Sequence, residues 1–288
     1  MELRRALTWH YMLAKRWHAG KVAGTLVFAL AAPIVLFWKP EWGGLVGAVA
    51  GVWVLAGRTI LSWLDRRHIQ KAVTIQEQFD VDIFDLEWNY SLAGHKIAPE
   101  DIHAAANKVR KGKQVERLRN CYPNVDGAVW PLDVLLCQRA NAVWGRRGHN
   151  RYAYLIVSLG VIWFIAGIVM AIFAHVTLAG YLVKVFLPSQ PAFLDTVDLF
   201  LGHRNLSLEK EALENDITAL WEKGVSNPAD VTRKDCRKFQ DKTFRLRQSG
   251  MQIPQVVYLA FRKRDEIAMH AATARLLSSL PNSNNQSA

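Results

Sequence analysis

The sequence has no charged residue between Tyr152 and Ala174, where it reads YAYLIVSLGVIWFIAGIVMAIFA. A bilayer core about 30 Å thick is crossed by roughly 20 apolar residues of α-helix. A soluble protein rarely leaves so long an apolar run without a charge. The absence therefore predicts a membrane-spanning helix, and the chain is expected to be a membrane protein.

Cysteine and catalytic motifs are also scarce. Cys121, Cys137 and Cys236 are the three cysteines of 288 residues, and their spacing matches no metal site. No P-loop, GxGxxG, GxSxG or HExxH motif occurs, and the nine histidines form no ligand cluster. The sequence thus predicts a protein that is not an enzyme and holds no resident metal or cofactor. The net charge of +11 is attributed mainly to segments that flank the membrane, so no DNA or RNA partner is expected.

Apolar segments are arranged as two hairpins around a more polar block. The four expected spans are Val22–Trp38, Gly43–Leu64, Tyr152–Ala174 and Leu178–Leu201. A cleaved signal peptide is the competing interpretation of the first segment. The fourth segment contains prolines and charged residues, and an irregular backbone at membrane depth is tolerated only against protein or a wet cavity.

Lysine and arginine gather before the first span, after the second and before the third, whereas the short connections contain almost none. Because positive charge stays on the cytoplasmic side, both termini and the central block are predicted to be cytoplasmic. The fold class predicted is an all-α membrane protein with helical cytoplasmic blocks. One such helix is expected over Ser207–Lys223, with Ser207 as its N-cap. The expected division is residues 1–21 as an N-terminal helix, 22–64 as the first hairpin, 65–150 as a helical block, 151–202 as the second hairpin and 203–288 as a helical region with a disordered end.

Four stretches resemble a known family in sequence and in order. They are YMLAK at Tyr11–Lys15, QEQFDVDIFDLEWN at Gln76–Asn89, NCYPNVDGAVWPLDVLLCQRANAVW at Asn120–Trp144 and FQDKTFRLRQSGMQIPQVVYLAFRKRDEIAM at Phe239–Met269. Together they are similar to the SMODS-associated four-transmembrane pore-forming effectors of bacterial anti-phage systems of the CBASS type. The likeness covers nearly the whole chain.

This resemblance implies a multi-pass protein of the bacterial inner membrane. A cyclic nucleotide made by a neighbouring nucleotidyltransferase would act as its ligand and trigger. The effector would then oligomerise or rearrange, permeabilise the membrane and cause abortive infection. The expected partners are the lipid bilayer, further copies of the chain and the nucleotide. The alternatives are a constitutive small ion channel or transporter, and a membrane-anchored accessory protein.

Basic and aromatic residues of the central block are the candidates for binding a phosphate and stacking on a base. They are Lys108, Arg110, Lys111, Lys113, Arg139, Arg146, Arg147, Trp88 and Trp144. The alternative interpretations of the basic turn at residues 108–113 are a solvated surface and a contact for anionic lipids.

Ionisable residues at membrane depth usually face water or a charged partner, so they are candidates for pore lining or gating. With the two prolines of the fourth segment, they are Arg58, Lys184, Pro188, Pro191, Asp195 and Asp198. A shorter fourth span would instead leave Lys184 at the outer interface and both aspartates at the inner one. The alternative for Arg58, at the inner end of the second span, is a contact with the lipid headgroups. Gly43, Gly47 and Gly51 lie four residues apart and predict close helix packing, either within the first hairpin or between protomers.

Polar residues of the family-like stretches predict a network that joins the central block to the tail. They are Gln76, Asp80, Asn89, Gln138, Asn141, Gln240, Asp241, Arg245 and Arg262. A structural role is expected for this network, and a two-state role in gating is a further hypothesis.

Overall fold

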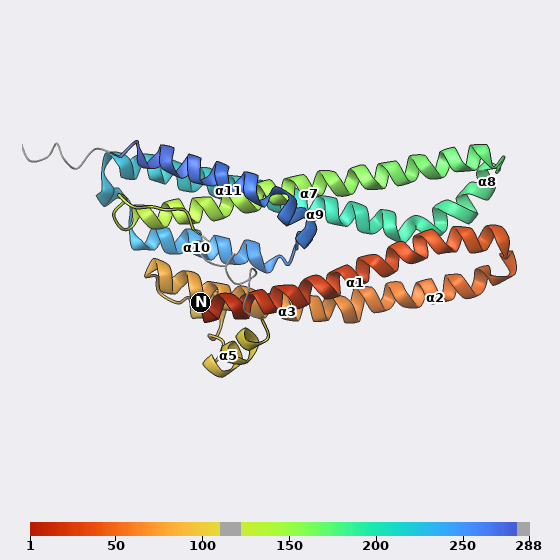
Figure 1. Ribbon diagram of the computed structural model, residues 1–288, viewed down its shortest axis with the longest axis horizontal. Helices are drawn as coiled ribbons and strands as arrows, with labels where there is room; N and C mark the ends of the chain where they lie inside the picture. Colours follow the sequence, from red (N-terminus) through yellow and green to blue (C-terminus); the bar gives the residue numbers. More distant parts are fainter. Residues whose placement is uncertain (110–121, 281–288) are drawn as a thin grey trace, which may run out of the picture. The chain divides into compact units, whose positions relative to one another are not determined.

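The computed structural model describes residues 1–109 and 122–280, and the secondary structure in these two ranges is entirely helical (Figure 1). The α-helices are α1 (Glu2–Trp38), α2 (Gly43–Ala56), α3 (Ser62–Phe84), α4 (Tyr90–Ala93), α5 (Pro99–Asn107), α7 (Leu132–Phe173), α8 (Leu178–Tyr181), α9 (Leu187–Ser226), α10 (Arg233–Gln248) and α11 (Gln255–Leu277). Short 3₁₀ turns lie at Pro40–Trp42 and Pro228–Asp230, and two π-helical turns, Gly57–Leu61 and Leu182–Phe186, adjoin α2 and α9. The all-α prediction is confirmed for the described ranges.

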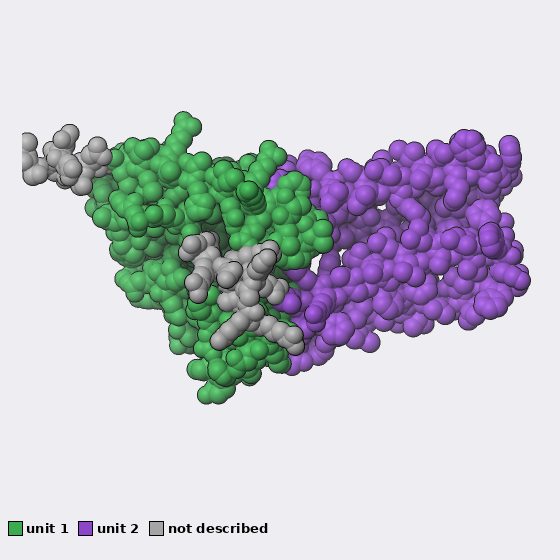
Figure 2. All heavy atoms as spheres, viewed as in Figure 1, with its two compact units in different colours: residues 1–11, 69–149, 205–288 green, residues 12–68, 150–204 purple. Residues whose placement is uncertain are grey.

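The chain divides into two compact units (Figure 2). Unit 1 contains residues 1–11, 69–149 and 205–288, and unit 2 contains residues 12–68 and 150–204. Unit 2 holds most of the apolar runs, whereas unit 1 holds most of the buried polar side chains.

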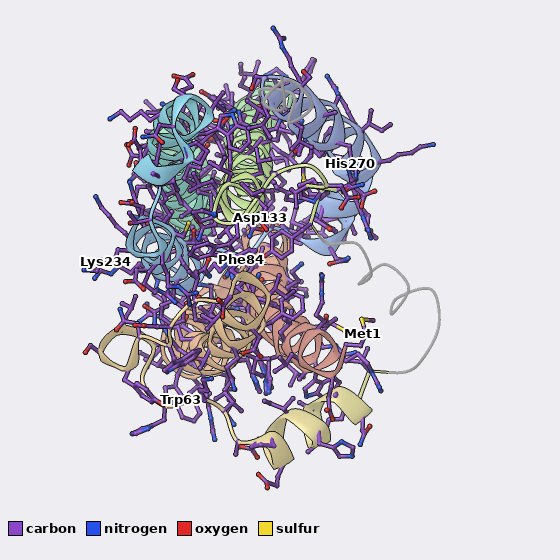
Figure 3. The ribbon with its side chains drawn as sticks, turned by 90° about the vertical axis from the view of Figure 1, so that its left-hand side faces the viewer. Met1, Trp63, Phe84, Asp133, Lys234 and His270 are labelled. Carbon is purple, nitrogen blue, oxygen red and sulfur yellow. The ribbon has the colours of Figure 1, made fainter. Side chains whose placement is uncertain are left out.

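Unit 1 is built around an apolar core that α3, α7, α9 and α10 share. Phe84, Leu135, Ile217 and Trp221 are almost completely buried in it, and burying such side chains contributes about 1.5–3 kcal/mol each. Figure 3 shows Phe84 among these helices, whereas Lys234 and His270 lie at the outside. The tertiary fold of unit 1 thus rests on helices that are far apart in the sequence.

The ends of α10 show why this segment forms a separate helix. Thr232 Oγ1 accepts a hydrogen bond from the Asp235 amide at 3.3 Å, and Asp235 Oδ2 accepts one from the Thr232 amide at 3.0 Å. This reciprocal arrangement is a capping box, which satisfies two backbone donors at the helix start. Gly250, with a φ of 80°, follows the helix and adopts the left-handed conformation that commonly ends one.

Unit 2 contains the apolar lengths of α1, α2, α7 and α9. The first two pack closely, because Gly24 lies directly against the Trp53 indole and leaves no room for a Cβ. A Cβ on Gly160 of α7 would likewise come within 2.8 Å of Thr196 Cγ2 on α9. Many apolar side chains of unit 2 remain outside, including Val52 at 68% and Ile162 at 62% exposure. Such exposure suits lipid contact rather than water contact.

Three helices of the described chain are long and apolar enough to cross a membrane. They are Glu2–Trp38, Pro40–Phe84 and Leu132–Phe173, with mean hydropathies of 1.9, 1.7 and 2.7 in their most apolar windows. These helices contain the first two expected spans and the third as far as Phe173. The expected fourth span is not among them, because its charged residues and prolines lower its apolar character.

The fourth segment is helical but irregular. It begins with α8, passes through the π turn Leu182–Phe186 and continues as α9, which runs through Pro191. Ser207 lies inside α9 and is buried, so its prediction as an N-cap was wrong. The helix does not begin there because it continues from the preceding apolar segment, and the Ser207 hydroxyl instead donates to the Arg146 carbonyl oxygen at 3.1 Å.

Candidate functional site

Asp80 is the centre of a group of buried polar side chains in unit 1. Its side chain is 1% exposed, and Arg247 Nη1 contacts Oδ2 at 2.6 Å. Gln240 donates to the same oxygen at 3.2 Å, and the Tyr122 hydroxyl donates to Oδ1 at 2.6 Å. Asn141 of α7 in turn donates to the Tyr122 hydroxyl oxygen at 3.0 Å. Asp80 therefore links α3 to α10 and, through Tyr122, to α7.

A second carboxylate, Glu77, extends this arrangement along α3. Its Oε1 lies 2.6 Å from Arg237 Nη2, and its Oε2 accepts a hydrogen bond from Gln240 at 2.7 Å. Arg237 also contacts Asp241 at 2.7 Å, and Asp241 accepts a hydrogen bond from Asn89 at 3.0 Å. We call this set the buried polar cluster: Glu77, Asp80, Asn89, Tyr122, Gln138, Asn141, Arg237, Gln240, Asp241 and Arg247.

Burial and pairing have opposite effects on the ionisation of the cluster. Burial raises the pKa of Glu77, although hydrogen bonds from Arg237 and Gln240 oppose the rise. Burial favours loss of the Arg247 proton, but attraction to Asp80, Tyr122 and Tyr11 and the hydrogen bond to Asp80 together outweigh burial and raise the Arg247 pKa. Burial and the neighbouring Asp80 raise the Tyr122 pKa well above its usual value. Arg247 therefore stays charged beside Asp80, and Tyr122 stays a neutral donor.

The structure brings together most of the polar residues that the sequence predicted. Gln138 donates to the Cys236 carbonyl oxygen at 2.8 Å and lies 3.4 Å from Gln240. Gln76 stands beside the cluster and accepts a hydrogen bond from the Tyr11 hydroxyl at 2.8 Å. Two predicted members lie elsewhere: Arg262 pairs with Glu266 at 2.7 Å along its own helix, and Arg245 is exposed.

Sequence reasoning missed three charged members of the cluster, Glu77, Arg237 and Arg247. A signal for them existed in the helical spacing. Glu77 lies three residues before Asp80, and Arg237 and Arg247 lie three residues before and seven after Gln240. Residues three, four or seven apart share one helix face. The acidic face of α3 and the basic face of α10 could therefore have been predicted from the sequence to pair.

The candidate arginines before the third span are already paired with acids. Arg139 lies 3.1 Å from Glu214 Oε1 and donates to the Thr218 hydroxyl at 2.9 Å. Arg146 Nε lies 2.8 Å from Glu214 Oε2. Arg147 Nη1 lies 3.7 Å from the buried Asp265. These contacts within unit 1 occupy the guanidinium groups that the sequence offered to a phosphate.

The structure describes both candidate tryptophans but only the first of the four basic candidates at residues 108–113. Trp88 donates to the Gly94 carbonyl oxygen at 2.9 Å and carries the Lys96 ammonium over its ring. Trp144 packs against Tyr258 with the ring centroids 6.0 Å apart. Lys108 lies over the Trp9 ring at 5.4 Å. The remaining basic candidates lie outside the described residues: Arg110, Lys111 and Lys113.

Three of the candidate pore residues meet in unit 2. Arg58 Nη2 lies 3.3 Å from Asp195 Oδ1 and 3.8 Å from Asp198 Oδ2. The side chains of Arg58 and Asp198 are 52% and 69% exposed. The contact joins the π turn after α2 to α9, so it is a polar link between the two expected hairpins. Exposed charges beside apolar spans are expected to face water or another protein.

Two π turns carry the candidate cations of unit 2. Arg58 lies in Gly57–Leu61 and Lys184 lies in Leu182–Phe186, where its ammonium sits 5.1 Å from the Phe37 ring centroid. The Ser62 hydroxyl donates to the Gly57 carbonyl oxygen at 2.8 Å. Hydroxyl groups commonly satisfy backbone atoms where a membrane helix departs from α geometry. Such π turns are frequent at functional sites.

Both candidate prolines lie in the irregular fourth segment. Pro188 lies in the first turn of α9, directly after the second π turn, and Pro191 lies inside the helix.

The three candidate glycines of α2 differ in the space around them. A Cβ on Gly43 would meet Leu36 at 2.7 Å, but one on Gly47 or Gly51 would meet nothing within 4 Å among the described residues. The close approach of α1 to α2 occurs at Gly24 instead, which the sequence analysis did not single out.

Helical content and long apolar helices define the chain as a multi-pass membrane protein. Comparison with known families then gives its relationship. The chain belongs to the family of the SMODS-associating 4TM effector domain, whose model matches residues 1–276. It is 28% identical over 285 residues to a Bacillus cereus (strain VD146) protein named as a probable CBASS effector molecule, covering 96% of this chain and 94% of that relative. No solved structure matches the chain.

Proposed function

We propose that the protein is the effector of a CBASS anti-phage system and permeabilises the bacterial inner membrane. A cyclic nucleotide from a neighbouring nucleotidyltransferase triggers it, and protomers then associate or rearrange so that ions leak and the infected cell dies. Family membership over residues 1–276 and the name of the Bacillus cereus relative support this assignment. The proposal assigns no catalytic step to the chain.

The proposed topology has four spans in two hairpins, at residues 22–64 and 151–202, with both termini in the cytoplasm. The three long apolar helices, which contain the first two of these spans and the third as far as Phe173, support this topology. The fourth, at Leu178–Leu201, crosses as α8, the π turn and the first part of α9. Residues 1–21, 65–150 and 203–288 form the cytoplasmic parts. An irregular fourth span suits a helix that lines a wet path.

The Arg58 contact with Asp195 and Asp198 is the single observation that carries the permeation proposal. The three groups join the two hairpins through charged atoms that are partly exposed in unit 2. A lipid contact would penalise such charges, whereas a water-filled path between protomers would hydrate them. We therefore assign pore lining to Arg58, Asp195 and Asp198, an outer contact to Lys184, and a bend to Pro188 and Pro191.

Close contact between protomers is assigned to the face of α2 that holds Gly47 and Gly51, with Gly43 packed inside the hairpin. Both glycines are open on the described side, and small residues let membrane helices approach closely. An oligomer is expected because the four helices of one protomer offer little room for a wide pore.

Dye release tests the proposal. The purified full-length chain is placed in liposomes that contain a self-quenched dye, with and without a panel of cyclic di- and trinucleotides. Release with one nucleotide, and none without it, is the expected result. Release without any nucleotide would favour a constitutive channel. No release from folded protein under any condition would overturn the permeation proposal and favour an accessory role.

A further inference from the structure

One buried ammonium group in unit 1 has no carboxylate partner within residues 1–109 and 122–280. Lys210 lies in α9 and is 8% exposed, and no ion pair joins its Nζ to an acid in these ranges. By contrast, the buried carboxylates Glu77 and Asp80 each contact an arginine. A buried charge without a partner is unfavourable, because water no longer solvates it. Lys210 therefore needs a physical explanation.

The acids near Lys210 are engaged elsewhere or exposed. Glu214, one turn further along α9, contacts both Arg139 and Arg146. Glu209 is the neighbouring residue in the sequence and lies on the exposed side of the helix. Neither of these acids forms an ion pair with the Lys210 ammonium in the described residues.

The packing of α7 leaves space for this ammonium. A Cβ on Gly145 would come within 2.8 Å of Lys210 Cε and 2.9 Å of Nζ. Any other residue at position 145 would therefore displace the end of the Lys210 side chain. Asn141 of the buried polar cluster precedes Gly145 by one turn, so the two residues lie on the same face of α7. Lys210 thus stands beside the cluster rather than on the open surface.

Burial and neighbouring charge both act on the Lys210 ammonium. Its pKa is lowered from 10.5 to about 8, mainly by burial and also by the positive charge of Arg247, and Glu209 opposes this only in part. At neutral pH most Lys210 side chains remain protonated. Lys210 therefore carries a positive charge beside the cluster that no acid of the described residues pairs with.

We infer that Lys210 binds a phosphate group, and that this group belongs to the cyclic oligonucleotide that triggers the effector. This inference rests on the proposed function. An ammonium offers three hydrogen-bond donors and binds phosphate as a compact charge. Each phosphodiester of a cyclic oligonucleotide carries one negative charge, so a single phosphate would supply the anion that Lys210 lacks. Anionic lipid headgroups and free phosphate share this chemistry, and the experiment separates them.

Two matched variants of the full-length protein test the inference. Lys210→Met keeps the apolar stem and removes the charge, and Lys223→Met does the same at an exposed position of the same helix. Binding is measured by thermal shift and by titration in nanodiscs of neutral lipid. The probes are cyclic di- and trinucleotides and inorganic phosphate, and a second set of nanodiscs contains anionic lipid.

The expected result has two parts that a merely structural lysine would not give together. Lys210→Met raises the melting temperature of the ligand-free protein, because a buried charge without a partner is removed. It also weakens nucleotide binding about tenfold or more, since a charge-assisted contact is lost. Lys223→Met leaves both values unchanged. Lysine acetylation read by mass spectrometry should show that the nucleotide protects Lys210 and not Lys223.

The outcomes separate this inference from the proposed function. If wild type binds a nucleotide and Lys210→Met binds it equally well, the inference is wrong and the proposed trigger stands. If wild type binds none of the nucleotides, both fail. Protection of Lys210 by phosphate or anionic lipid alone would support a phosphate contact and overturn its assignment to the messenger. A lower melting temperature in ligand-free Lys210→Met would show a structural role and also overturn the inference.

Discussion

Two arginine–aspartate pairs, one in each unit, join the same chemical groups in opposite surroundings. The Arg247–Asp80 contact of unit 1 is 2.6 Å long, and its side chains are 11% and 1% exposed. The Arg58–Asp195 contact of unit 2 is 3.3 Å long, and its side chains are 52% and 23% exposed. Removing one member of a buried pair leaves a charge that cannot be solvated, whereas an exposed pair contributes little to stability.

This difference teaches how the two units use charge. In unit 1 the charged groups hold helices that are distant in the sequence, as Glu77 and Asp80 do with Arg237 and Arg247. In unit 2 the Arg58 group lies beside apolar surface and is open to its surroundings. We therefore expect substitutions in unit 1 to change folding first, and substitutions at Arg58 to change permeation first.

Removing the central carboxylate of unit 1 should produce the largest effect. Asp80→Asn leaves Arg247 buried without a counter-charge, and the expected loss is about 3–5 kcal/mol of unfolding free energy. The matched control is Asp82→Asn, an exposed position of the same helix, which should change stability by less than about 0.5 kcal/mol. Thermal unfolding in nanodiscs, with hydrogen exchange of the α10 amides, measures both. Equal melting temperatures for the two variants would contradict the role given to Asp80.

The pH dependence of unit 1 should be the next largest effect. The pKa of Lys210 is lowered from 10.5 to about 8, so its charge destabilises the folded state fully below pH 8. Between pH 8 and 10 the folded state loses this proton first, and stability should rise, by at most about 3 kcal/mol. Arg247 and Glu209 are the charged groups that act on the Lys210 ammonium, the first lowering and the second raising its pKa.

Unfolding measured from pH 7 to 10 in wild type and Lys210→Met checks this rise. Lys15 of unit 2, whose pKa burial lowers to about 8, contributes in the same direction, so the difference between the two proteins is the relevant quantity. The variant should keep only the part of the rise that is due to Lys15. Identical pH profiles would show that Lys210 titrates alike in the folded and unfolded states.

Two glycines of unit 2 should respond differently to the same substitution. Gly24→Ala places a methyl group against the Trp53 indole and should cost about 1–3 kcal/mol through overpacking. Gly47→Ala meets nothing within 4 Å among the described residues, so the stability of one protomer should hardly change. Cross-linking of Gly47→Leu in liposomes then tests contact between protomers, and unchanged oligomers would remove this face of α2 from the interface.

The smallest change in stability is expected at the exposed pair. Arg58→Gln should alter the unfolding free energy by less than about 1 kcal/mol, yet it should change dye release measurably because it removes the link to Asp195. Arg16→Gln, an exposed position of the same unit, is the control and should behave as wild type. A large loss of stability without a change in dye release would show that Arg58 stabilises the fold. The charged pairs of the two units would then have the same role, contrary to the difference described above.

Part of this organisation could be predicted from the sequence. The uncharged run at Tyr152–Ala174 predicts a membrane-spanning helix, because a helix that crosses the bilayer needs an apolar stretch of that length. Asp80, Asn89 and Gln240 were recognised as one network from family-like stretches, and the structure brings them together through Arg237 and Asp241.

Other features depend on tertiary packing and could not be predicted. Arg139 and Arg146 pair with an acid of α9 that lies more than sixty residues later in the sequence. Because no acid close in sequence indicated this pairing, both arginines were predicted as candidates for binding a phosphate. The burial of Lys210 follows from α9 lying against Gly145, which no local pattern reveals. The prediction of Ser207 as an N-cap was wrong because it considered only the residues that follow Ser207. The helix α9 begins at Leu187, twenty residues earlier, so Ser207 lies in its interior.

The π turns give the helices of unit 2 two places where the length of the chain can change. An α-helix advances 100° per residue, and the wider turn at Gly57–Leu61 accommodates one residue more than an α-helical turn. Deleting one residue there would restore regular α geometry and leave the later side chains of the helix facing as before, whereas the same deletion in a regular α segment would rotate them by about 100°. Single-residue deletions should therefore be tolerated better in the π turns than in the regular helices beside them.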